Sequence, residues 1–377
     1  MNKNNKLNIL HLASYFSGVS KVYEHLFQAT DKLGHTQFVY VPYRVLKKEK
    51  DIRFSIPESK VFLRPIYNKF SRVAYFYKLN KAYKDIIKQL PVTEMDITHA
   101  HTWFTDGGLA YRLYKEHNKP YVVTIRSTDL SAFAKYFYHT QKYARNILLN
   151  AKKIVFLSKA YQDRVLHLPF IKKYAQIIEG KSIIIPNGVD DFWIENNQQR
   201  KKALSEKVKL IYIGSFIDRK NLVRLIEACV LLNKKGYGLH LDLVGGSPTY
   251  SDELKELINT SSSVNFLGRV TDKNKLAELI RKSDVFVMPS YNETFGLVYI
   301  EALSQGIPVL YTQNDGIDGL YDSENIGEAV DAFDVEDIMK KLSGLIKNYE
   351  QYDFNPETIV KNHNWNLIVR KLVGTYK

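Results

Sequence analysis

The sequence predicts an α/β protein made of two domains, each with its own doubly wound parallel β-sheet. Short apolar runs alternate with segments of helical period along the whole chain, which is the pattern of repeated β-α-β units. The chain has 377 residues, which is more than one hydrophobic core usually organises. A turn-rich stretch near the middle separates two halves that show the same alternation.

The expected β-strands are short apolar runs. In the first half they span residues 7–12, 37–41, 97–100, 121–125, 153–157 and 182–185. In the second half they span residues 209–214, 240–244, 264–267, 285–288 and 308–311. Helical segments separate almost all of them, so each half predicts a Rossmann-like domain.

The hinge is expected at residues 186–190, where Pro186, Asn187 and Gly188 end a strand with turn-forming residues. The polar segment 195–207 follows. The first domain is therefore expected to cover residues 1–187, and the second to begin at residue 188.

Charge is distributed unevenly between the halves. Residues 1–190 contain 31 Lys and Arg against 14 Asp and Glu, whereas residues 191–377 contain 23 against 26. A basic first domain attracts anionic partners such as nucleic acid, a phosphorylated acceptor or an acidic membrane surface. A solvated basic surface without any such partner is the alternative.

Residues 64–90 are rich in basic and aromatic side chains, with Asp85 as the sole acid. Lysines recur there at helical spacing, at Lys81, Lys84 and Lys88. One interpretation is a basic amphipathic helix that lies on anionic lipid headgroups. The other is a surface helix that buries aromatic side chains in the domain, namely Phe70, Phe76 and Tyr83.

The sequence also favours a cytoplasmic location, including the inner face of the plasma membrane. Cys229 is the single cysteine and lies in an apolar run, so it predicts a small buried side chain and fits a reducing compartment. Asn8 and His11 interrupt the first apolar stretch, which argues against a signal peptide. No apolar segment is long enough to predict a transmembrane helix.

Residues 289–304 carry the strongest chemical signal. They follow the expected strand 285–288 and open a helix, and a helix N-terminus at the carboxyl edge of a parallel sheet suits a phosphate. Glu293 lies in the loop and Glu301 lies roughly 12 Å further along by helical rise. The two carboxylates can therefore reach two different hydroxyl-bearing rings. The alternative is a capping glutamate followed by an ordinary helical glutamate.

The spacing of Glu293 and Glu301, with seven residues between them, closely resembles the E-x7-E signature of glycosyltransferase family 4. The resemblance implies that Glu293 approaches the donor sugar and that Glu301 accepts hydrogen bonds from the ribose hydroxyls. It implies that the residues between them bind the sugar and phosphate oxygens of the donor, namely Thr294, Phe295, Gly296 and Leu297.

Three further segments resemble the same family in the same order. The loop 214–221 resembles G-x-x-x-x-x-K-[GN], in which the family clamps the donor diphosphate. Residues 244–246 resemble the V-G-x-G turn, and residues 266–270 resemble the F-x-G-x-V segment that meets the nucleobase. The donor-site residues implied by these segments are Gly214, Ser215, Arg219, Lys220, Asn221, Gly245, Arg269 and Val270.

The Arg219–Lys220 pair also has a physical rationale of its own. Negative charge collects on a departing diphosphate as a glycosidic bond breaks, and two fixed cations stabilise that charge. Arginine offers a planar fork and lysine a compact point charge. The chain contains no D-x-D triplet that could hold a metal with the diphosphate. We therefore expect neither a metal nor another cofactor.

The first half matches the family less closely. Gly18 lies where the family has a G-G loop near the donor phosphate, with Ser17 in place of the first glycine. Residues 96–101 resemble D-[IV]-[IV]-H-x-H, which makes His101 the expected cleft residue. His99 points in the same direction by strand alternation, so the choice between the two histidines stays open.

Arg126 is the clearest departure from the resemblance, because members of the family commonly have a histidine there, close to the reacting sugar. An arginine cannot act as a general base near neutral pH, but it can hold a phosphate or carboxylate bidentately. The substitution therefore points to an anionic group on the acceptor or the donor. The alternative is a structural pair between Arg126 and Asp129.

Residues 364–372 resemble the terminal helix that returns to the first domain in this family, so the second domain is expected to end at residue 354, with 355–377 crossing back. The resemblance implies a GT-B fold with an inter-domain cleft. It also implies a retaining transfer of a hexose-type sugar from UDP, in preference to GDP, to a surface-glycan or lipid-linked acceptor. A GT-B nucleotide-sugar epimerase and a basic nucleic-acid-binding protein are the alternatives, and nucleic acid is not the expected partner.

Overall fold

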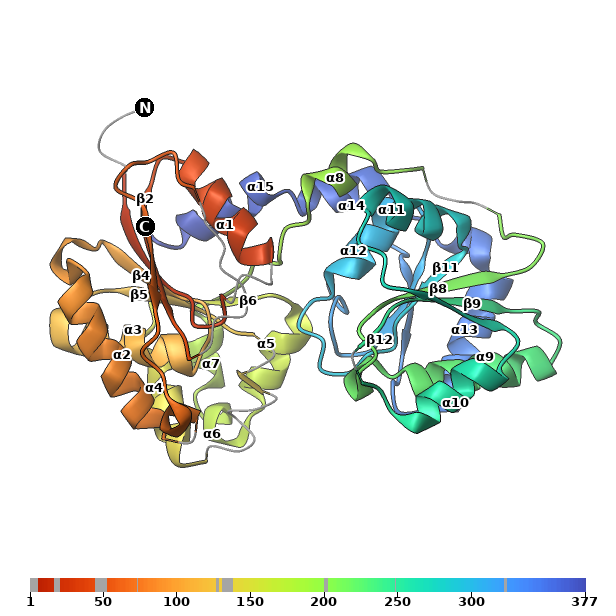
Figure 1. The fold of residues 1–377 in the computed structure, drawn as a ribbon, viewed down its shortest axis with the longest axis horizontal. Coiled ribbons are helices and arrows are strands. Elements are labelled where there is room, and N and C mark those ends of the chain that lie inside the picture. Colours follow the sequence, from red (N-terminus) through yellow and green to blue (C-terminus); the bar gives the residue numbers. More distant parts are fainter. Residues whose placement is uncertain are drawn as a thin grey trace. The chain divides into compact units, whose positions relative to one another are not determined.

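The computed structural model describes residues 6–16, 21–44, 53–72, 74–126, 129–130, 138–199, 203–247, 249–321 and 324–377. The chain divides into two compact units, each built around a parallel β-sheet (Figure 1). The first unit holds the described residues up to Gly188, apart from residues 158–160, together with Trp365–Lys377. The second holds residues 158–160 and Val189–Asn364. The predicted α/β fold with two parallel sheets is confirmed.

The described part of the first unit contains a seven-stranded sheet in the order β3-β2-β1-β4-β5-β6-β7, with all neighbours parallel. Its strands are β1 (Asn8–Leu12), β2 (Thr36–Pro42), β3 (Lys60–Arg64), β4 (Ile97–Ala100), β5 (Tyr121–Thr124), β6 (Lys153–Phe156) and β7 (Ser182–Ile184). The six expected strands are present. The edge strand β3 was not expected, because its apolar run is only three residues long, between Lys60 and Arg64, and its residues are half-buried or exposed.

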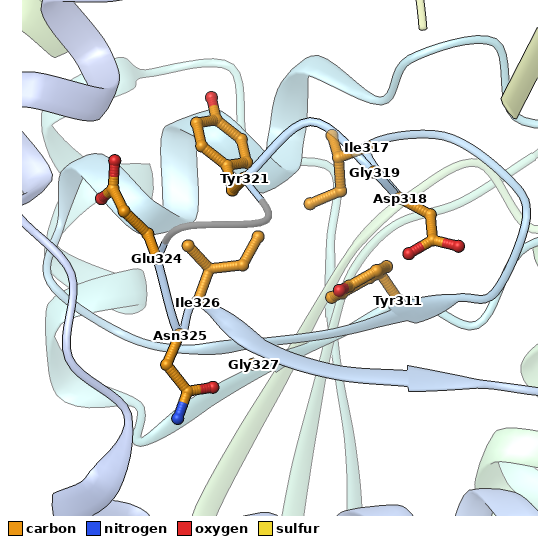
Figure 2. A pocket seen from close by; sticks show the side chains of 9 residues that line it. All are labelled: Tyr311, Ile317, Asp318, Gly319, Tyr321, Glu324, Asn325, Ile326 and Gly327. Atoms are coloured by element: carbon orange, nitrogen blue, oxygen red, sulfur yellow. The ribbon is translucent and has the colours of Figure 1, made fainter. Parts of the chain in front are cut away.

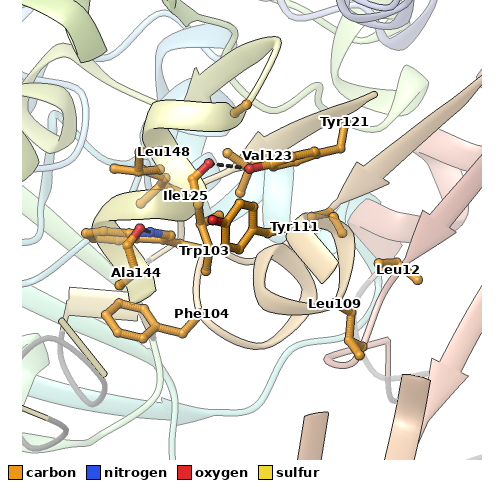
Figure 3. Packing of buried hydrophobic residues seen from close by; sticks show 14 of the residues in the cluster. Leu12, Trp103, Phe104, Leu109, Tyr111, Tyr121, Val123, Ile125, Ala144 and Leu148 are labelled. Carbon is orange, nitrogen blue, oxygen red and sulfur yellow. Dashed lines mark hydrogen bonds between the residues drawn. The ribbon is translucent and has the colours of Figure 1, made fainter. Parts of the chain in front are cut away.

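Helices cover both faces of this sheet (Figure 1). They are α1 (Lys21–Lys32), α2 (Tyr75–Gln89), α3 (Thr105–His117), α4 (Gln141–Asn150), α5 (Lys159–Leu166), α6 (Pro169–Lys172), α7 (Ala175–Glu179) and α15 (Trp365–Gly374). On the face of α2, α3 and α4, Trp103 and Tyr121 are fully buried among aliphatic side chains (Figure 3). Their polar atoms donate to the carbonyls of Ala144 and Ile147, so this core leaves neither group unsatisfied.

The end of the chain belongs to the first unit. Helix α15 packs against α1, and its apolar face joins the core on that side of the sheet. Lys152 Nζ donates to the carbonyl oxygens of Tyr376 and Lys377 at 2.9 and 2.6 Å. The preceding helix α14 (Pro356–Asn362) belongs to the second unit, so the return to the first unit begins at Trp365 rather than at residue 355.

The described part of the second unit contains a six-stranded parallel sheet in the order β10-β9-β8-β11-β12-β13. Its strands are β8 (Lys209–Gly214), β9 (His240–Gly245), β10 (Val264–Gly268), β11 (Val285–Val287), β12 (Val309–Thr312) and β13 (Gly327–Val330). The edge strand β13 was not expected, because Gly-Glu-Ala-Val has low β-propensity.

The helices of the second unit lie on both faces of its sheet (Figure 1). They are α8 (Asp191–Glu195), α9 (Leu222–Lys234), α10 (Asp252–Thr260), α11 (Lys273–Lys282), α12 (Leu297–Ser304), α13 (Val335–Lys347) and α14. Cys229 on α9 is buried, as predicted.

Helix α2 has an apolar inner face and a mixed outer face. Leu79, Ala82 and Ile86 are buried, which anchors the helix on the first unit. Phe76 is 50% exposed and Phe70, in the preceding turn Lys69–Arg72, is 60% exposed. The expectation that a surface helix buries these two phenylalanines is therefore wrong. Within the described part of the chain, no helix is both long and apolar enough to cross a bilayer.

Candidate functional site

The loop after β8 is held by the side chain of Asn221. This residue adopts a left-handed conformation with φ of 59°, which asparagine tolerates better than most residues. Its amide nitrogen donates to the carbonyls of Pro289, at 3.0 Å, and Ala332, and its Oδ1 accepts from Arg224. The loop that carries Arg219 and Lys220 is thereby joined to the residues that follow β11. The expected contact of Asn221 with a donor stays a prediction.

Lys220 and Glu293 form the chemical centre of the second unit. Lys220 Nζ lies 2.5 Å from Glu293 Oε2 and 3.6 Å from the sulfur of Met288. Arg219 Nη1 lies 3.4 Å from the same carboxylate oxygen. The side chains of Lys220 and Glu293 are nearly buried, whereas 41% of the Arg219 side chain is exposed. Two predicted loops far apart in the sequence therefore meet in one cluster.

The charges in this cluster are unequal. Burial alone raises the pKa of Glu293, but the adjacent Lys220 and then Arg219 outweigh burial and lower that pKa below its usual value. Glu293 is therefore ionised at neutral pH and compensates one of the two cations. The cluster keeps an excess of positive charge and suits a further anion.

Glu301 has the opposite electrostatic environment. Burial and then the negative charge of Asp190 raise the pKa of Glu301 to about 7, although Lys273 works against this shift. Lys273 Nζ lies 2.5 Å from Asp190 Oδ2. The carboxylate of Glu301 accepts no hydrogen bond from any residue that the structure describes. It can accept hydrogen bonds from the hydroxyls of a ligand.

The turn into α12 presents backbone N–H groups. Gly296 caps the helix with φ of 81°, and a Cβ at this position would lie 2.6 Å from the ring of Tyr299, so a glycine is required. Phe295 is buried, and the centre of its ring lies 5.3 Å from that of His363. The N–H groups of Gly296 and Leu297 donate to no described residue, as expected at a helix N-terminus.

The remaining predicted donor residues follow the carboxyl ends of neighbouring strands. Gly214 pairs with Gly245 at the ends of β8 and β9, and a Cβ on Gly245 would lie 1.8 Å from the Gly214 carbonyl oxygen. Ser215 is half-buried, Arg269 is exposed and Val270 is half-buried, directly after the ends of β8 and β10. Thr294 is buried, and its carbonyl accepts a hydrogen bond from Ser158. These residues share one edge of the sheet because its strands are parallel.

Three buried histidines lie side by side in the first unit, from β1 and from the end of β4. His11 Nδ1 and His101 Nε2 lie 3.1 Å apart, and His99 bonds to the hydroxyls of Tyr376 and Thr124 at 2.7 and 2.8 Å. Burial lowers the pKa of His11 to about 3, with the Gln37 side chain opposing the shift, and lowers the pKa of His99 and His101 well below the usual value. All three imidazoles are therefore neutral.

The histidine cluster is the group of described residues with the geometry to hold a metal ion. One ring nitrogen from each of His11, His99 and His101 lies within 4.8 Å of the others. Both nitrogens of His99 already bond to hydroxyl groups, so the ring is oriented without an ion. The expectation that no metal takes part stays a prediction.

Arg126 follows β5 and lies near the same histidines. Its backbone N–H, rather than its guanidinium, donates to Asp129 Oδ2 at 2.9 Å. Arg126 and Asp129 are therefore paired, as suggested, but through the Arg126 backbone and not through an ion pair of their side chains. The guanidinium Nε donates to the carbonyl of His101 at 3.1 Å. Gly18 lies outside the described residues.

Sequence reasoning missed Asp106, which is fully buried at the start of α3. Its carboxylate accepts hydrogen bonds from the N–H and hydroxyl of Ser14, after β1, and from the hydroxyl of Thr102. Burial raises the pKa of Asp106 to about 7 against these bonds. The sequence signal for this site was an acidic residue, Asp106, shortly after an expected strand. Its partner Ser14 lies 92 residues away in the sequence, so their contact could not be predicted.

A polar pocket of about 210 Å³ lies beside the end of β12 and the start of β13, and none of the predicted site residues lines it (Figure 2). Asn325 Nδ2 donates to Gln351, and Tyr321 bonds to His363. Asp318 accepts from the backbone of Asn314. These side chains are engaged with the protein, so the pocket offers less chemistry than the Lys220–Glu293 cluster.

Comparison with known proteins agrees with this geometry. The family described as Glycosyltransferase Family 4 matches residues 16–191, and Glycosyl transferases group 1 matches residues 194–356. The chain belongs to glycosyltransferase family 4. It is therefore a glycosyltransferase, and the Glu293 to Glu301 segment lies within the second match.

Relatives of this glycosyltransferase extend over nearly its whole length. The alpha-monoglucosyldiacylglycerol synthase of Acholeplasma laidlawii is 25% identical over 371 residues, covering 92% of this chain and 88% of the relative. The structure of sucrose-phosphate synthase from Thermosynechococcus elongatus superposes with a TM-score of 0.74 at 20% identity over 98% of both chains. That of Anabaena HepE in complex with UDP and glucose gives 0.67 at 17% identity over 98% of this chain and 99% of the other. The fold is GT-B.

Proposed function

We propose that this glycosyltransferase moves a hexose-type sugar from a nucleotide diphosphate, UDP in preference to GDP, to a lipid-linked or surface-glycan acceptor. The observation that carries the proposal is the cluster of Arg219, Lys220 and Glu293, with 2.5 Å between Lys220 Nζ and the carboxylate. Two cations against one carboxylate leave positive charge for a diphosphate. The UDP held by the Anabaena structure of the same fold supports the nucleotide.

The roles of the other donor residues follow from their environments. Glu301 has a carboxylate without a hydrogen-bond donor among the described residues, which suits the two hydroxyls of a ribose. The N–H groups of Gly296 and Leu297 suit sugar or phosphate oxygens. Glu293, held ionised beside Lys220, would lie against the donor sugar.

We further propose that transfer retains the anomeric configuration and needs no metal. The departing phosphate would accept the proton of the acceptor hydroxyl on the same face of the sugar, while Arg219 and Lys220 stabilise its charge. NMR of the isolated product distinguishes the outcomes. Inversion at the anomeric carbon would exclude this mechanism.

The acceptor is proposed to reside at an anionic membrane surface, at the inner face of the plasma membrane. Helix α2 exposes Phe76, Tyr77 and Ile87 beside Lys84 and Lys88 on its outer face. Aromatic side chains next to lysines are the composition of helices that bind anionic lipid headgroups. The lipid named in the Acholeplasma relative supports an acceptor of this class.

Thermal-shift titration tests the donor proposal. UDP, GDP, their glucose conjugates and a short DNA duplex are added separately to the wild type and to Lys220→Ala. UDP at about 100 times its Kd should stabilise the native wild type by about 2.7 kcal/mol, and the substitution should remove most of that gain. Absence of any nucleotide effect would reject the proposal, and stabilisation by DNA alone would favour a nucleic-acid-binding protein.

Sedimentation with vesicles tests the membrane proposal. Vesicles of phosphatidylcholine with phosphatidylglycerol should bind the wild type, and Lys84→Gln combined with Lys88→Gln should weaken binding by about 1 kcal/mol per lysine. Lys255→Gln on α10 is the matched control, because this exposed lysine lies on the second unit. Equal binding by all three proteins would contradict the assignment to α2.

A further inference from the structure

Arg126 is a partly buried cation whose terminal nitrogens bond to none of the residues that the structure describes. Its Nε donates to the His101 carbonyl at 3.1 Å, and the guanidinium carbon lies 5.0 Å from the centre of the Tyr23 ring. Neither Nη atom forms a hydrogen bond or an ion pair with any residue that the structure describes. One edge of the guanidinium is therefore fixed, and the opposite edge is available.

Other arginines of the first unit are paired differently. Arg64 donates to both oxygens of Asp85 at 2.9 and 2.8 Å. Arg112 donates to Glu116 at 2.7 Å while stacking over the ring of Tyr83 at 3.8 Å. Arg126 shares the aromatic support of Arg112, but no carboxylate of a described residue contacts its guanidinium.

Asp129 lies near Arg126, but its carboxylate does not bind the Arg126 guanidinium. Its carboxylate accepts hydrogen bonds from the backbone N–H groups of Trp103, Phe104 and Arg126, at 3.0, 3.1 and 2.9 Å. These three bonds hold the turns after β4 and β5 together. The Asp129 carboxylate therefore fixes the backbone that carries the guanidinium and does not itself bond to the Nη atoms.

The neighbouring imidazoles contribute orientation rather than charge. His99 and His101 are fully buried and neutral, so these rings add no charge beside the Arg126 guanidinium. A small cavity of about 20 Å³ beside Arg126, lined by His99 and Thr124, has room for about one water molecule. A ligand of larger size can therefore meet the arginine only on its exposed side.

We propose that Arg126 binds a carboxylate or phosphate of a substrate through its free Nη edge and makes the enzyme selective for a charged substrate. The residue follows β5 at the carboxyl edge of a parallel sheet, where ligands of such folds bind. Because the planar guanidinium is already held through Nε, its opposite edge can donate to two oxygens of an anion with little further loss of side-chain freedom. The substrate's identity rests on the proposed glycosyl transfer, and the anion can belong to the donor sugar or to the acceptor.

Two pairs of substrates distinguish these sources. On the donor side, UDP-glucuronate is compared with UDP-glucose. On the acceptor side, phosphatidic acid is compared with diacylglycerol in neutral detergent micelles. The variants are Arg126→Gln and Arg126→Lys, with Arg112→Gln as the matched control that also removes an arginine stacked on a tyrosine ring.

The wild type should prefer the charged member of one pair, and Arg126→Gln should raise its KM by about 10–100-fold, as expected for bonds to a charged group. The KM of the neutral member should change less than about threefold, Arg126→Lys should lie between, and Arg112→Gln should behave as wild type. Equal changes for both members, or none, would overturn the proposal.

A binding measurement separates this proposal from the proposed function. In a Lys220→Ala background, where the nucleotide site is weakened, inorganic phosphate should still stabilise the protein against heat, and adding Arg126→Gln should abolish that stabilisation. If phosphate stabilises neither Lys220→Ala nor the double variant with Arg126→Gln, the anion site is rejected. If the wild type binds no nucleotide but phosphate still stabilises the protein, the glycosyl-transfer proposal is rejected and the anion site is retained.

Discussion

The carboxyl edges of the two sheets differ in how buried ionisable side chains are arranged. In the second unit, Lys220 and Glu293 compensate each other at 2.5 Å, so the cluster is ionised before any ligand arrives. In the first unit, burial keeps His11, His99 and His101 neutral, and the Arg126 guanidinium contacts no carboxylate of a described residue. Under the proposed function, the second edge would already be charge-compensated when a diphosphate binds, whereas the first would receive its counter-charge from a substrate.

The largest test concerns the buried pair. Lys220→Ala should lower the free energy of unfolding by about 3–5 kcal/mol, because it leaves the Glu293 carboxylate buried with only Arg219 nearby. Lys220→Met with Glu293→Gln should recover most of this loss, since no uncompensated charge remains. Urea denaturation gives both values. A single substitution as stable as the wild type would show that the pair is not charge-compensated.

The next test uses the pH dependence of Glu301. Its pKa is raised to about 7, so it is protonated at pH 5.5 and ionised at pH 8.5. If the ionised form accepts the ribose hydroxyls, affinity for UDP should rise about tenfold across this range, which corresponds to ~1.4 kcal/mol. Calorimetric titration of the wild type and Glu301→Gln measures it, and the variant should bind weakly at both pH values.

The same group has a defined effect on stability. Because its pKa is higher in the folded state than in the unfolded state, the folded state holds more protons between about pH 4.5 and 7, so its contribution to stability declines as pH rises through this window. Glu301→Gln should remove this decline. A wild type and variant with identical pH profiles of unfolding would contradict the raised pKa.

A smaller effect is expected on the first edge. Tyr376→Phe removes the hydroxyl that bonds to His99 Nδ1 at 2.7 Å and should lower stability by about 1–3 kcal/mol, because a buried ring nitrogen loses its partner. Tyr376 is itself buried, so the ring stays in place. Tyr237→Phe on the second unit is a control, and equal losses for both would indicate that the His99 bond contributes nothing.

No change is the expected result of metal removal. The bonds of His99 to Tyr376 and Thr124 orient its ring without an ion, so EDTA followed by gel filtration should alter neither activity nor melting temperature. Elemental analysis of the purified protein is the direct measurement. Stoichiometric zinc, lost together with stability on chelation, would reverse the assignment of the histidine cluster.

Local sequence was sufficient for most of the fold. The buried strands of both sheets are near-continuous apolar runs, as expected where helices cover both faces. The edge strands β3 and β13 were missed because their apolar runs are short, whereas the other two edge strands, β7 and β10, were predicted. The site motifs were also readable, since loops that follow parallel strands meet at one sheet edge.

Tertiary structure alone decided the charge states and pairings. The sequence named Arg219, Lys220, Glu293 and Glu301, but only the fold brings Lys220 to Glu293 across 73 residues and places Asp190 near Glu301. It likewise directs the Asp129 carboxylate to backbone N–H groups and leaves the Nη atoms of Arg126 without a hydrogen-bond partner among the described residues. Motif spacing determines which residues reach an edge, whereas ionisation depends on burial and on neighbours distant in sequence.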